Sequence, residues 1–389
     1  MHAAPLPRYF RSVLFAVATG LLSASTLAQA PAAPALAAPA LAAKSWLLLE
    51  HGSGQVLASQ APESRIEPAS LTKLMTAYVS FSALRQKTLR LEQFVPVSTT
   101  AWKAEGSRMF IDPKQSVTVG DLLKGMIIQS GNDACVALAE AIAGSEAKFA
   151  DLMNREAQRL GMANTKFMNA TGLPDPQHMT TASDLAKLAG AMIRDFPEEY
   201  ARYYAQKDFT WNKITQPNRN RLLWSDPSVD GMKTGFTEAA GYCLITSAKR
   251  GPRRLVSIVL GAGSDYARAA ESQKLLAWGW QAFDAIKVFD ARQAVTSLRV
   301  YKGADNAVAA GFAQDLVLAL PKGAAAQLKA DFVGPAFRVG PIAAGQPLGT
   351  VRVSVAGQPF GEYPALALAA VPQAGFIGRF IDHIRLWFA

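Results

Sequence analysis

The feature that most constrains the fold is the stretch Ser70 to Leu84, which is apolar on nearly every side and contains no Gly or Pro. Pro68 stands just before it, where the first turn of a helix tolerates proline. A helix without a polar face has to be surrounded by other elements. The chain therefore needs a large core, and its 389 residues, 50% of them hydrophobic and 18% charged, supply one with room for a second domain.

Strands are predicted at both ends of this first region. Residues 44–60 contain two apolar runs separated by Gly52-Ser53-Gly54, and a second pair of runs flanks a turn at Arg250-Gly251-Pro252. Both patterns are typical of hairpins. A short strand is also expected at Leu222-Leu223-Trp224. Helices are predicted over residues 119–143, 144–161, 181–193 and 266–286. Strands at both ends of a helical middle indicate an α+β domain, an antiparallel sheet covered by helices, over residues 44–286.

The pattern changes after this domain. Short apolar runs separated by Gly and Pro turns predict a small all-β domain over residues 287–372. In residues 373–389, aromatic and aliphatic residues recur at helical spacing from Phe376 to Phe388, and arginines take the other side. Such an amphipathic helix lies in a membrane interface or packs on the second domain, and we favour the interfacial anchor.

The N-terminus has the pattern of an export signal. Arg8 and Arg11 precede a short apolar run, and small residues follow around Ala28-Gln29-Ala30. The run is too short to span a bilayer, so residues 1–30 are predicted to be a signal peptide that is removed. Residues 31–43, rich in Ala and Pro, are expected to form a semi-extended tether.

Charge and cysteine usage exclude several classes of function. The net charge of +10 suits anionic surroundings such as lipid head groups or wall polymers. The sequence contains no basic block with interleaved aromatic residues, so nucleic-acid binding is not expected. None of the four histidines forms a metal-ligand pattern, and no phosphate-binding glycine loop is present, so neither a metal nor a cofactor is expected. Cys135 and Cys243 are expected to be free buried thiols, with a disulfide as the alternative that export would permit.

The candidate chemistry begins with Ser70-Leu71-Thr72-Lys73, which places a hydroxyl and an amine on one face of the predicted helix. A serine hydroxyl is a poor nucleophile until a base takes its proton. A desolvated lysine has a lowered pKa and can be that base. Taken alone, this spacing is weak, because it also occurs at ordinary helix starts.

Two further motifs follow in order along the chain. Ser130-Gly131-Asn132 is preceded by an apolar segment and followed by Asp133-Ala134-Cys135, and Asp230-Gly231-Met232 leads into Lys233-Thr234-Gly235-Phe236-Thr237. The three motifs together are the signature of penicillin-binding proteins and serine β-lactamases. With these flanks the chain resembles the low-molecular-mass penicillin-binding proteins that are serine-type D-alanyl-D-alanine carboxypeptidases (peptidase family S11). The resemblance is strong over 44–286 and extends over the rest only as layout.

The resemblance implies a fold and a reaction. The fold would be a serine β-lactamase and penicillin-binding transpeptidase-like domain, followed by the small β domain and the terminal helix. Ser70 would attack the carbonyl between the two terminal D-alanines of a peptidoglycan stem peptide, and Lys73 would accept its proton. The backbone N–H groups of Ser70 and Phe236 would form the oxyanion hole, and Ser130 would return a proton to the leaving amine.

The remaining motif residues would bind substrate. Asn132 would hold the substrate amide, and Arg219, in Asn218-Arg219-Asn220, would clamp the terminal carboxylate, although a surface arginine is the alternative for this position. The other residues expected in this subsite are Lys233, Thr234, Gly235, Phe236 and Thr237. Several relatives have histidine where this chain has Phe236, so the pH dependence or polarity of the pocket is expected to differ.

The resemblance also implies partners and a location. The enzyme would be inhibited covalently by β-lactams and would work, exported, on the periplasmic face of the cytoplasmic membrane, held peripherally by its terminal helix. A loop at Gly106-Ser107 is expected near the site, and His178 is expected to be structural. Two alternatives share the motifs: a β-lactamase, for which no activating glutamate is identified and Glu140 and Glu146 are taken as surface residues, and a D,D-endopeptidase. A third alternative, a non-catalytic wall-binding scaffold, is expected to have lost Ser70 or Lys73, and both are present.

Overall fold

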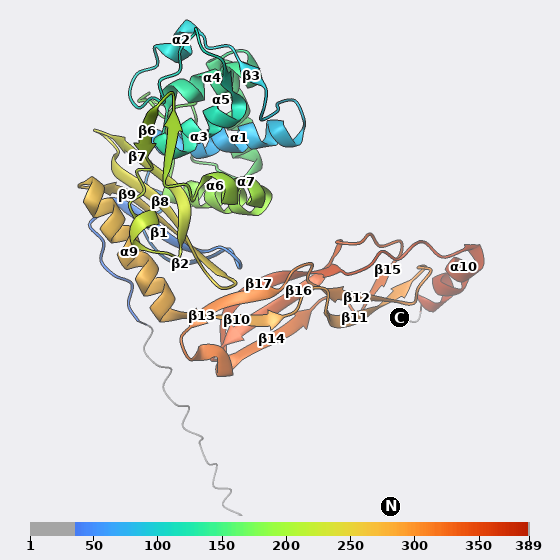
Figure 1. Ribbon diagram of the computed structural model, residues 1–389. Coiled ribbons are helices and arrows are strands. Elements are labelled where there is room, and N and C mark those ends of the chain that lie inside the picture. Colours follow the sequence, from blue (N-terminus) through green and yellow to red (C-terminus); the bar gives the residue numbers. More distant parts are fainter. Residues whose placement is uncertain (1–35, 388–389) are drawn as a thin grey trace, which may run out of the picture. The chain divides into compact units, whose positions relative to one another are not determined.

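The computed structural model describes residues 36–387 (Figure 1). The expected signal peptide and the first part of the expected tether lie outside the described residues. Residues 36–43 lie against the long helix α9 (Asp265–Ala282), because Trp278 Nε1 donates to Leu36 O at 3.0 Å and Lys274 Nζ donates to Ala40 O at 2.8 Å. This part of the segment is therefore packed and does not run as a free tether.

The first domain is built on a five-stranded antiparallel sheet with the order β2-β1-β9-β8-β7. The two predicted hairpins form it together with β7, which lies at its edge. Its strands are β1 (Ser45–Glu50), β2 (Gln55–Gln60), β7 (Val229–Thr237), β8 (Gly241–Arg250) and β9 (Arg253–Ala262). Two small two-stranded sheets lie outside it, formed by β3 (Phe94–Val95) with β4 (Val117–Thr118) and by β5 (Asp208–Trp211) with β6 (Ile214–Pro217).

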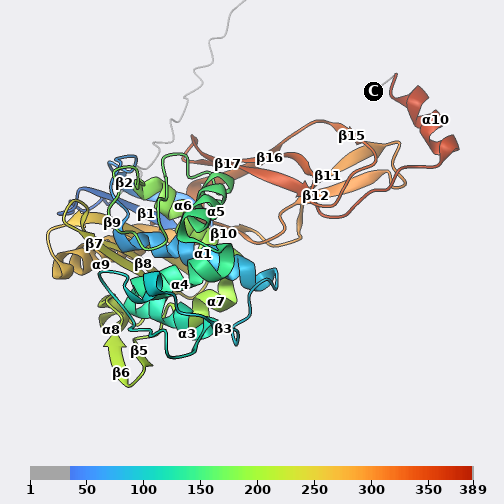
Figure 2. The same cartoon turned by 90° about the horizontal axis from the view of Figure 1, so that it is seen from above.

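Helices cover both faces of this sheet. Side chains alternate along β1, so that Leu47 and Leu49 enter one core while Trp46 and Leu48 enter the other. Helix α9 covers the second core, to which the short helix α8 (Leu222–Ser225) also contributes, and the remaining helices of this domain gather on the opposite face (Figures 1 and 2). These helices are η1 (Ala69–Thr72), α1 (Lys73–Arg85), α2 (Thr99–Trp102), α3 (Val119–Lys124), η2 (Gly125–Gln129), α4 (Asn132–Ala143), α5 (Glu146–Arg159), α6 (Ala182–Asp195) and α7 (Pro197–Tyr203).

The helix α1 has the environment that its sequence requires. Ten of its residues are buried, among them Leu74, Met75 and Phe81. It contacts α4, α5 and α6, which supply the surrounding apolar surface. The α+β class expected from the sequence is confirmed.

Three of the predicted elements are wrong in detail. The helix expected over 119–143 is interrupted at Ser130, where the backbone is left-handed with φ of 73°. The helix expected over 266–286 ends at Ala282, because Phe283 begins a strand that pairs with Leu316–Pro321. The segment at Leu222-Leu223-Trp224 is helical, in α8, where Asn220 Oδ1 accepts a hydrogen bond from the Leu222 N–H.

The second domain is all β, as expected, with its own apolar core. A six-stranded sheet has the order β14-β16-β17-β12-β11-β15, and β10 pairs with β13. The elements are β10 (Phe283–Phe289), β11 (Ala294–Tyr301), β12 (Ala307–Gly311), β13 (Leu316–Pro321), η3 (Ala324–Gln327), β14 (Leu328–Val333), β15 (Phe337–Val339), β16 (Pro347–Val355) and β17 (Gln358–Ala367). A terminal helix α10 (Phe376–Arg385) follows. No helix in residues 36–387 combines the length and apolarity needed to cross a bilayer.

Candidate active site

Ser70 lies in the short helix η1, one turn before Lys73, the first residue of α1. The Lys73 Nζ is 3.0 Å from the Ser70 Oγ. Ser70 is partly exposed, whereas Lys73 is buried with only 1% of its surface exposed. The pair therefore offers an accessible hydroxyl with a desolvated amine behind it.

The Lys73 amine has two further partners. It donates to Asn132 Oδ1 at 2.6 Å and to the backbone oxygen of Thr171 at 2.5 Å. Burial lowers the pKa of Lys73 because the charged form loses its hydration, and the positive charge of Arg219 lowers it further. A lysine in this environment is far more readily neutral than one in water.

The second motif occupies a strained turn between η2 and α4. The η2 segment is a π-helical turn, a form often found at functional sites, and it ends in the left-handed Ser130. Asp133, buried at 1% exposure, accepts hydrogen bonds from the backbone N–H groups of Met109, Phe110 and Ile111. These bonds tie the turn to the neighbouring loop and explain why the predicted helix is interrupted here.

That neighbouring loop contains Gly106, expected near the site from the sequence. Asn132 Nδ2 donates to Glu105 O at 2.6 Å, and the Asn132 N–H donates to Ser107 O at 2.6 Å. Gly106 has φ of 79°, and a Cβ there would lie 2.9 Å from Asn132 Nδ2. The glycine therefore allows the loop to approach Asn132, which keeps one lone pair and one N–H for a substrate.

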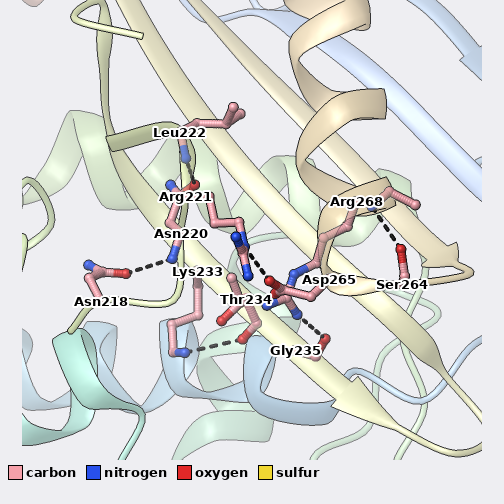
Figure 3. A network of polar contacts seen from close by, with 11 residues as sticks. Asn218, Asn220, Arg221, Leu222, Lys233, Thr234, Gly235, Ser264, Asp265 and Arg268 are labelled. Atoms are coloured by element: carbon pink, nitrogen blue, oxygen red, sulfur yellow. Dashed lines mark hydrogen bonds and ion pairs between the residues drawn. The ribbon is translucent and has the colours of Figure 1, made fainter. Parts of the chain in front are cut away.

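The third motif lies on β7. Lys233 Nζ donates to Thr234 O at 3.1 Å (Figure 3) and to Ser130 Oγ at 2.9 Å, so it joins the second and third motifs. Burial holds the pKa of Lys233 well below its ordinary value, and the charge of Lys73 lowers it further. The site thus contains two buried lysines, each beside a serine hydroxyl.

Gly235 brings β7 against the nucleophile. A Cβ at Gly235 would lie 3.2 Å from the Ala69 Cβ and 3.2 Å from the Pro68 oxygen, closer than side chains ordinarily pack. The strand and η1 are therefore in direct contact, and the backbone beyond Gly235 lies next to Ser70. The contact is possible because Gly235 has no side chain.

The three motifs enclose a cavity of about 250 Å³. Arg219 and Arg268 line it, and none of the described residues that line it is acidic, so the cavity is suited to an anionic group. The Thr237 hydroxyl donates to Glu67 Oε2 at 2.7 Å, so it is already engaged as a donor. The lining residues are Ser70, Gly106, Ser107, Ser130, Asn132, Thr171, Gly172, Leu173, Arg219, Thr234, Gly235, Phe236, Thr237 and Arg268.

Every site residue predicted from the sequence lies in this cavity or directly behind it. Lys73 and Lys233 are behind the wall, and the other eight line it. Thr171 and Arg268 were not predicted. Thr171 acts through its backbone oxygen, which leaves no trace in the sequence, whereas the spacing of Asp265 and Arg268, one helical turn apart, was a usable signal for Arg268.

Other expectations concern residues near the site. His178 is buried, and its Nε2 is 3.0 Å from the Thr72 Oγ1, which fits the structural role expected. Cys135 and Cys243 are free and buried, as expected. Glu140 and Glu146 are half-buried and not surface residues, because Glu140 accepts from Ser98 Oγ and Glu146 accepts from the Ala170 N–H.

Comparison with known proteins shows which family this chain matches. Residues 31–264 match the family model of the D-alanyl-D-alanine carboxypeptidases, peptidase family S11. Residues 283–373 match that of the C-terminal domain of penicillin-binding protein 5. The D-alanyl-D-alanine carboxypeptidase DacC of Escherichia coli K12 is 42% identical over 354 residues, which cover 89% of this chain and 88% of that protein.

Solved structures support the same family assignment. Penicillin-binding protein 5 of Haemophilus influenzae is 39% identical with a TM-score of 0.81 and is covered completely by 87% of this chain. Penicillin-binding protein D2 of Listeria monocytogenes, solved in an ampicillin-bound form, is 32% identical with a TM-score of 0.57, covering 62% of this chain and 98% of its own. The chain therefore belongs to the S11 family of D-alanyl-D-alanine carboxypeptidases and is a serine-type carboxypeptidase with the penicillin-binding protein 5 fold.

Proposed function

We propose that the enzyme removes the terminal D-alanine of peptidoglycan stem pentapeptides through an acyl-enzyme on Ser70. The observation that carries the proposal is the set of partners around Lys73. When the amine is neutral, Asn132 Oδ1 and Thr171 O take its two hydrogens, and its lone pair is left facing the Ser70 hydroxyl. A neutral lysine in this position is a general base for Ser70.

A second proton transfer has to serve the leaving group. The amine of the departing D-alanine needs a proton, and Ser130 is the hydroxyl that lines the cavity with a lysine behind it. Lys233 supports this role, because its Nζ holds the Ser130 Oγ at 2.9 Å, and Ser130 replaces the proton that it gives to the amine with the one that Lys73 took from Ser70. Lys73 is then neutral again and acts as the base when water attacks the acyl-enzyme.

The free carboxylate of the substrate selects the bond that is cut. Arg219 lines the cavity, and its planar guanidinium suits a bidentate pair with a carboxylate. Thr234 lines the same cavity and Lys233 lies directly behind it, so both support the same subsite. The N–H groups of Ser70 and Phe236 stabilise the negative oxygen of the tetrahedral intermediate.

The same cavity accounts for inhibition by β-lactams in this proposal. A β-lactam presents a strained amide and a carboxylate, so it acylates Ser70 as the peptide does. Rapid hydrolysis of that adduct needs a water activated by a carboxylate, and none of the described residues lining the cavity is a carboxylate. We therefore expect a persistent penicilloyl enzyme, which favours a carboxypeptidase over a β-lactamase.

We also propose that the enzyme is exported and is held at the periplasmic face of the cytoplasmic membrane by α10. The helix docks through Asp382, which is buried and accepts from the Lys302 N–H at 2.7 Å. Its apolar side chains nevertheless stay exposed, which supports an anchor over a packed terminal helix. The signal peptide needed for export lies outside the described residues.

The experiment is product analysis with purified protein. Free D-alanine should appear from a muramyl pentapeptide, and Ser70→Ala should abolish both this release and covalent labelling by penicillin, because the acylated oxygen is gone. Ser82→Ala, on the following helix α1 and outside the cavity, is the matched control and should keep both. Release that survives in Ser70→Ala would refute the assignment. Splitting of cross-linked dimers without D-alanine release would indicate an endopeptidase.

A further inference from the structure

We propose that Arg268 is a positioning residue of this reaction. By donating to the carbonyl oxygen of Gly235, it orients and polarises the peptide unit whose N–H, that of Phe236, faces the oxygen of the tetrahedral intermediate. The inference rests on the acyl-enzyme mechanism proposed above and adds to it the residue that prepares the oxyanion hole.

The first support is the geometry of one peptide unit. Arg268 is buried, with 5% of its surface exposed, and its Nη1 lies 3.1 Å from the Gly235 oxygen. The Gly235 oxygen and the Phe236 N–H belong to one rigid plane and point in opposite directions. Fixing the oxygen therefore fixes the direction of the N–H. A charged donor on the oxygen also makes the N–H a stronger donor, since hydrogen bonds in a chain polarise one another.

The second support is how firmly the guanidinium is held. Its Nη2 donates to Asp265 Oδ1 one turn earlier on α9, and the other oxygen of Asp265 accepts from Arg221 Nε at 2.5 Å (Figure 3). Its Cζ lies 5.6 Å from the centre of the Tyr242 ring, which in turn packs on the Phe236 ring at 4.4 Å. Arg268 is thus fixed from three sides around the peptide unit that it contacts.

The competing role for Arg268 is direct pairing with the substrate carboxylate. Two of its five N–H donors are already engaged, with Gly235 and with Asp265, so partners within the protein set the orientation of the guanidinium. Arg219 lines the same cavity and is the arginine assigned to the carboxylate above. Replacing Arg268 and replacing Arg219 should therefore have different effects on kcat and KM.

The test compares Arg268→Gln and Arg268→Lys with a matched control. Arg253 is also buried, and it donates to two backbone carbonyls, those of Phe283 and Gly279, at the far end of α9. Arg253→Gln should leave kcat unchanged. Arg268→Gln should lower kcat about tenfold or more with little change in KM, because the lost interaction belongs to the transition state. Arg268→Lys should recover part of the loss, since an ammonium still donates to the Gly235 oxygen.

A second measurement separates the two roles of arginine. Phenylboronic acid forms a tetrahedral adduct with a reactive serine and has no carboxylate. Arg268→Gln should weaken its binding about tenfold, whereas Arg219→Gln should leave its binding nearly unchanged and raise KM for the peptide.

Three results would overturn the inference: an unchanged kcat in Arg268→Gln, a raised KM at constant kcat, or an equal loss in Arg253→Gln. If Arg268→Gln does not fold, as judged by its thermal melting, Arg268→Lys decides by the same criteria. A wild-type enzyme that neither releases D-alanine nor is labelled by penicillin would refute the proposed function instead.

Discussion

At the scale of single residues, the site depends on keeping two lysines out of water. Lys73 and Lys233 are 1% and 3% exposed, and the amine of each forms a hydrogen bond with a serine hydroxyl. The positive charges around them make their protonation harder still. Both the burial and the arginines thus act in the direction that frees a base at moderate pH.

The pH dependence of acylation should report this arrangement. Acylation needs neutral Lys73, so the rate rises as the pH passes upward through the pKa of Lys73. Arg219 lowers that pKa by its charge. Arg219→Gln should therefore raise it and move the acidic limb of the profile to higher pH. The measurement is the limiting rate of acylation at saturating penicillin, which is independent of weaker binding.

Arg250 provides the control for this experiment. It is exposed at the turn between β8 and β9 and does not line the cavity, so Arg250→Gln should leave the profile in place. A limb that moves to lower pH in Arg219→Gln, or does not move, would contradict the role of Arg219.

The residue scale also shows what the sequence could reveal. Ser70, Lys73 and Ser130 stand at motif spacings that are visible without coordinates. Thr171 was not predictable, because it contributes only a backbone oxygen, and any side chain could accompany it. Thr237 was predicted as a carboxylate ligand, yet its hydroxyl is committed to Glu67, 170 residues away, a pairing that no local pattern reveals.

At the scale of elements, the break between η2 and α4 creates the second motif. Apolar periodicity across 119–143 indicates one continuous helix, although Ser130-Gly131-Asn132 is a run of poor helix formers that permits an interruption. The cause is tertiary, since buried Asp133 satisfies three N–H groups of another segment. The local structure was therefore predictable where the burial of apolar residues determines it, as in α1 and the β8–β9 hairpin. It was not predictable where hydrogen bonds to distant polar groups determine it.

Asp133→Asn tests the value of this connection. An amide has one acceptor oxygen where the carboxylate has two, so at least one buried N–H of Met109, Phe110 or Ile111 loses its partner. The free energy of unfolding should fall by about 1–3 kcal/mol, measured by urea denaturation, and penicillin labelling should slow as the turn loosens. Asp151→Asn, at an exposed position on α5, should change neither. Unchanged stability in Asp133→Asn would show that the loop is held by other contacts.

At the scale of the whole molecule, two apolar cores on the faces of one sheet build the catalytic domain, and a third core builds the β domain. This division was predictable, because it follows from the change in hydrophobic pattern near residue 287. The boundary between the two domains was harder to predict, because the Phe283 side chain continues the apolar pattern of α9 while its backbone already belongs to β10. The apolar side of α10 remains outside these cores.

That side is the basis of the last prediction. The exposed fractions of its apolar side chains run from 43 to 80%, for Phe376, Ile377, Phe380, Ile381, Ile384 and Trp387. Moving one aromatic side chain from water into a bilayer interface contributes about 1.5–3 kcal/mol, so each Phe380→Ser or Trp387→Ser substitution should weaken binding to vesicles of phosphatidylethanolamine and phosphatidylglycerol by about tenfold or more. Cosedimentation measures this binding.

The matched control for the anchor is His383→Ser, because His383 is exposed on the same helix and is not part of the apolar side. It should bind vesicles almost as well as the parent, and D-alanine release from a soluble peptide should be equal in all variants, since none of these residues lines the cavity. A chain ending at residue 375 should stay in the supernatant. If that shortened chain still sediments with vesicles, another surface holds the protein, and the exposed apolar side of α10 has a different purpose.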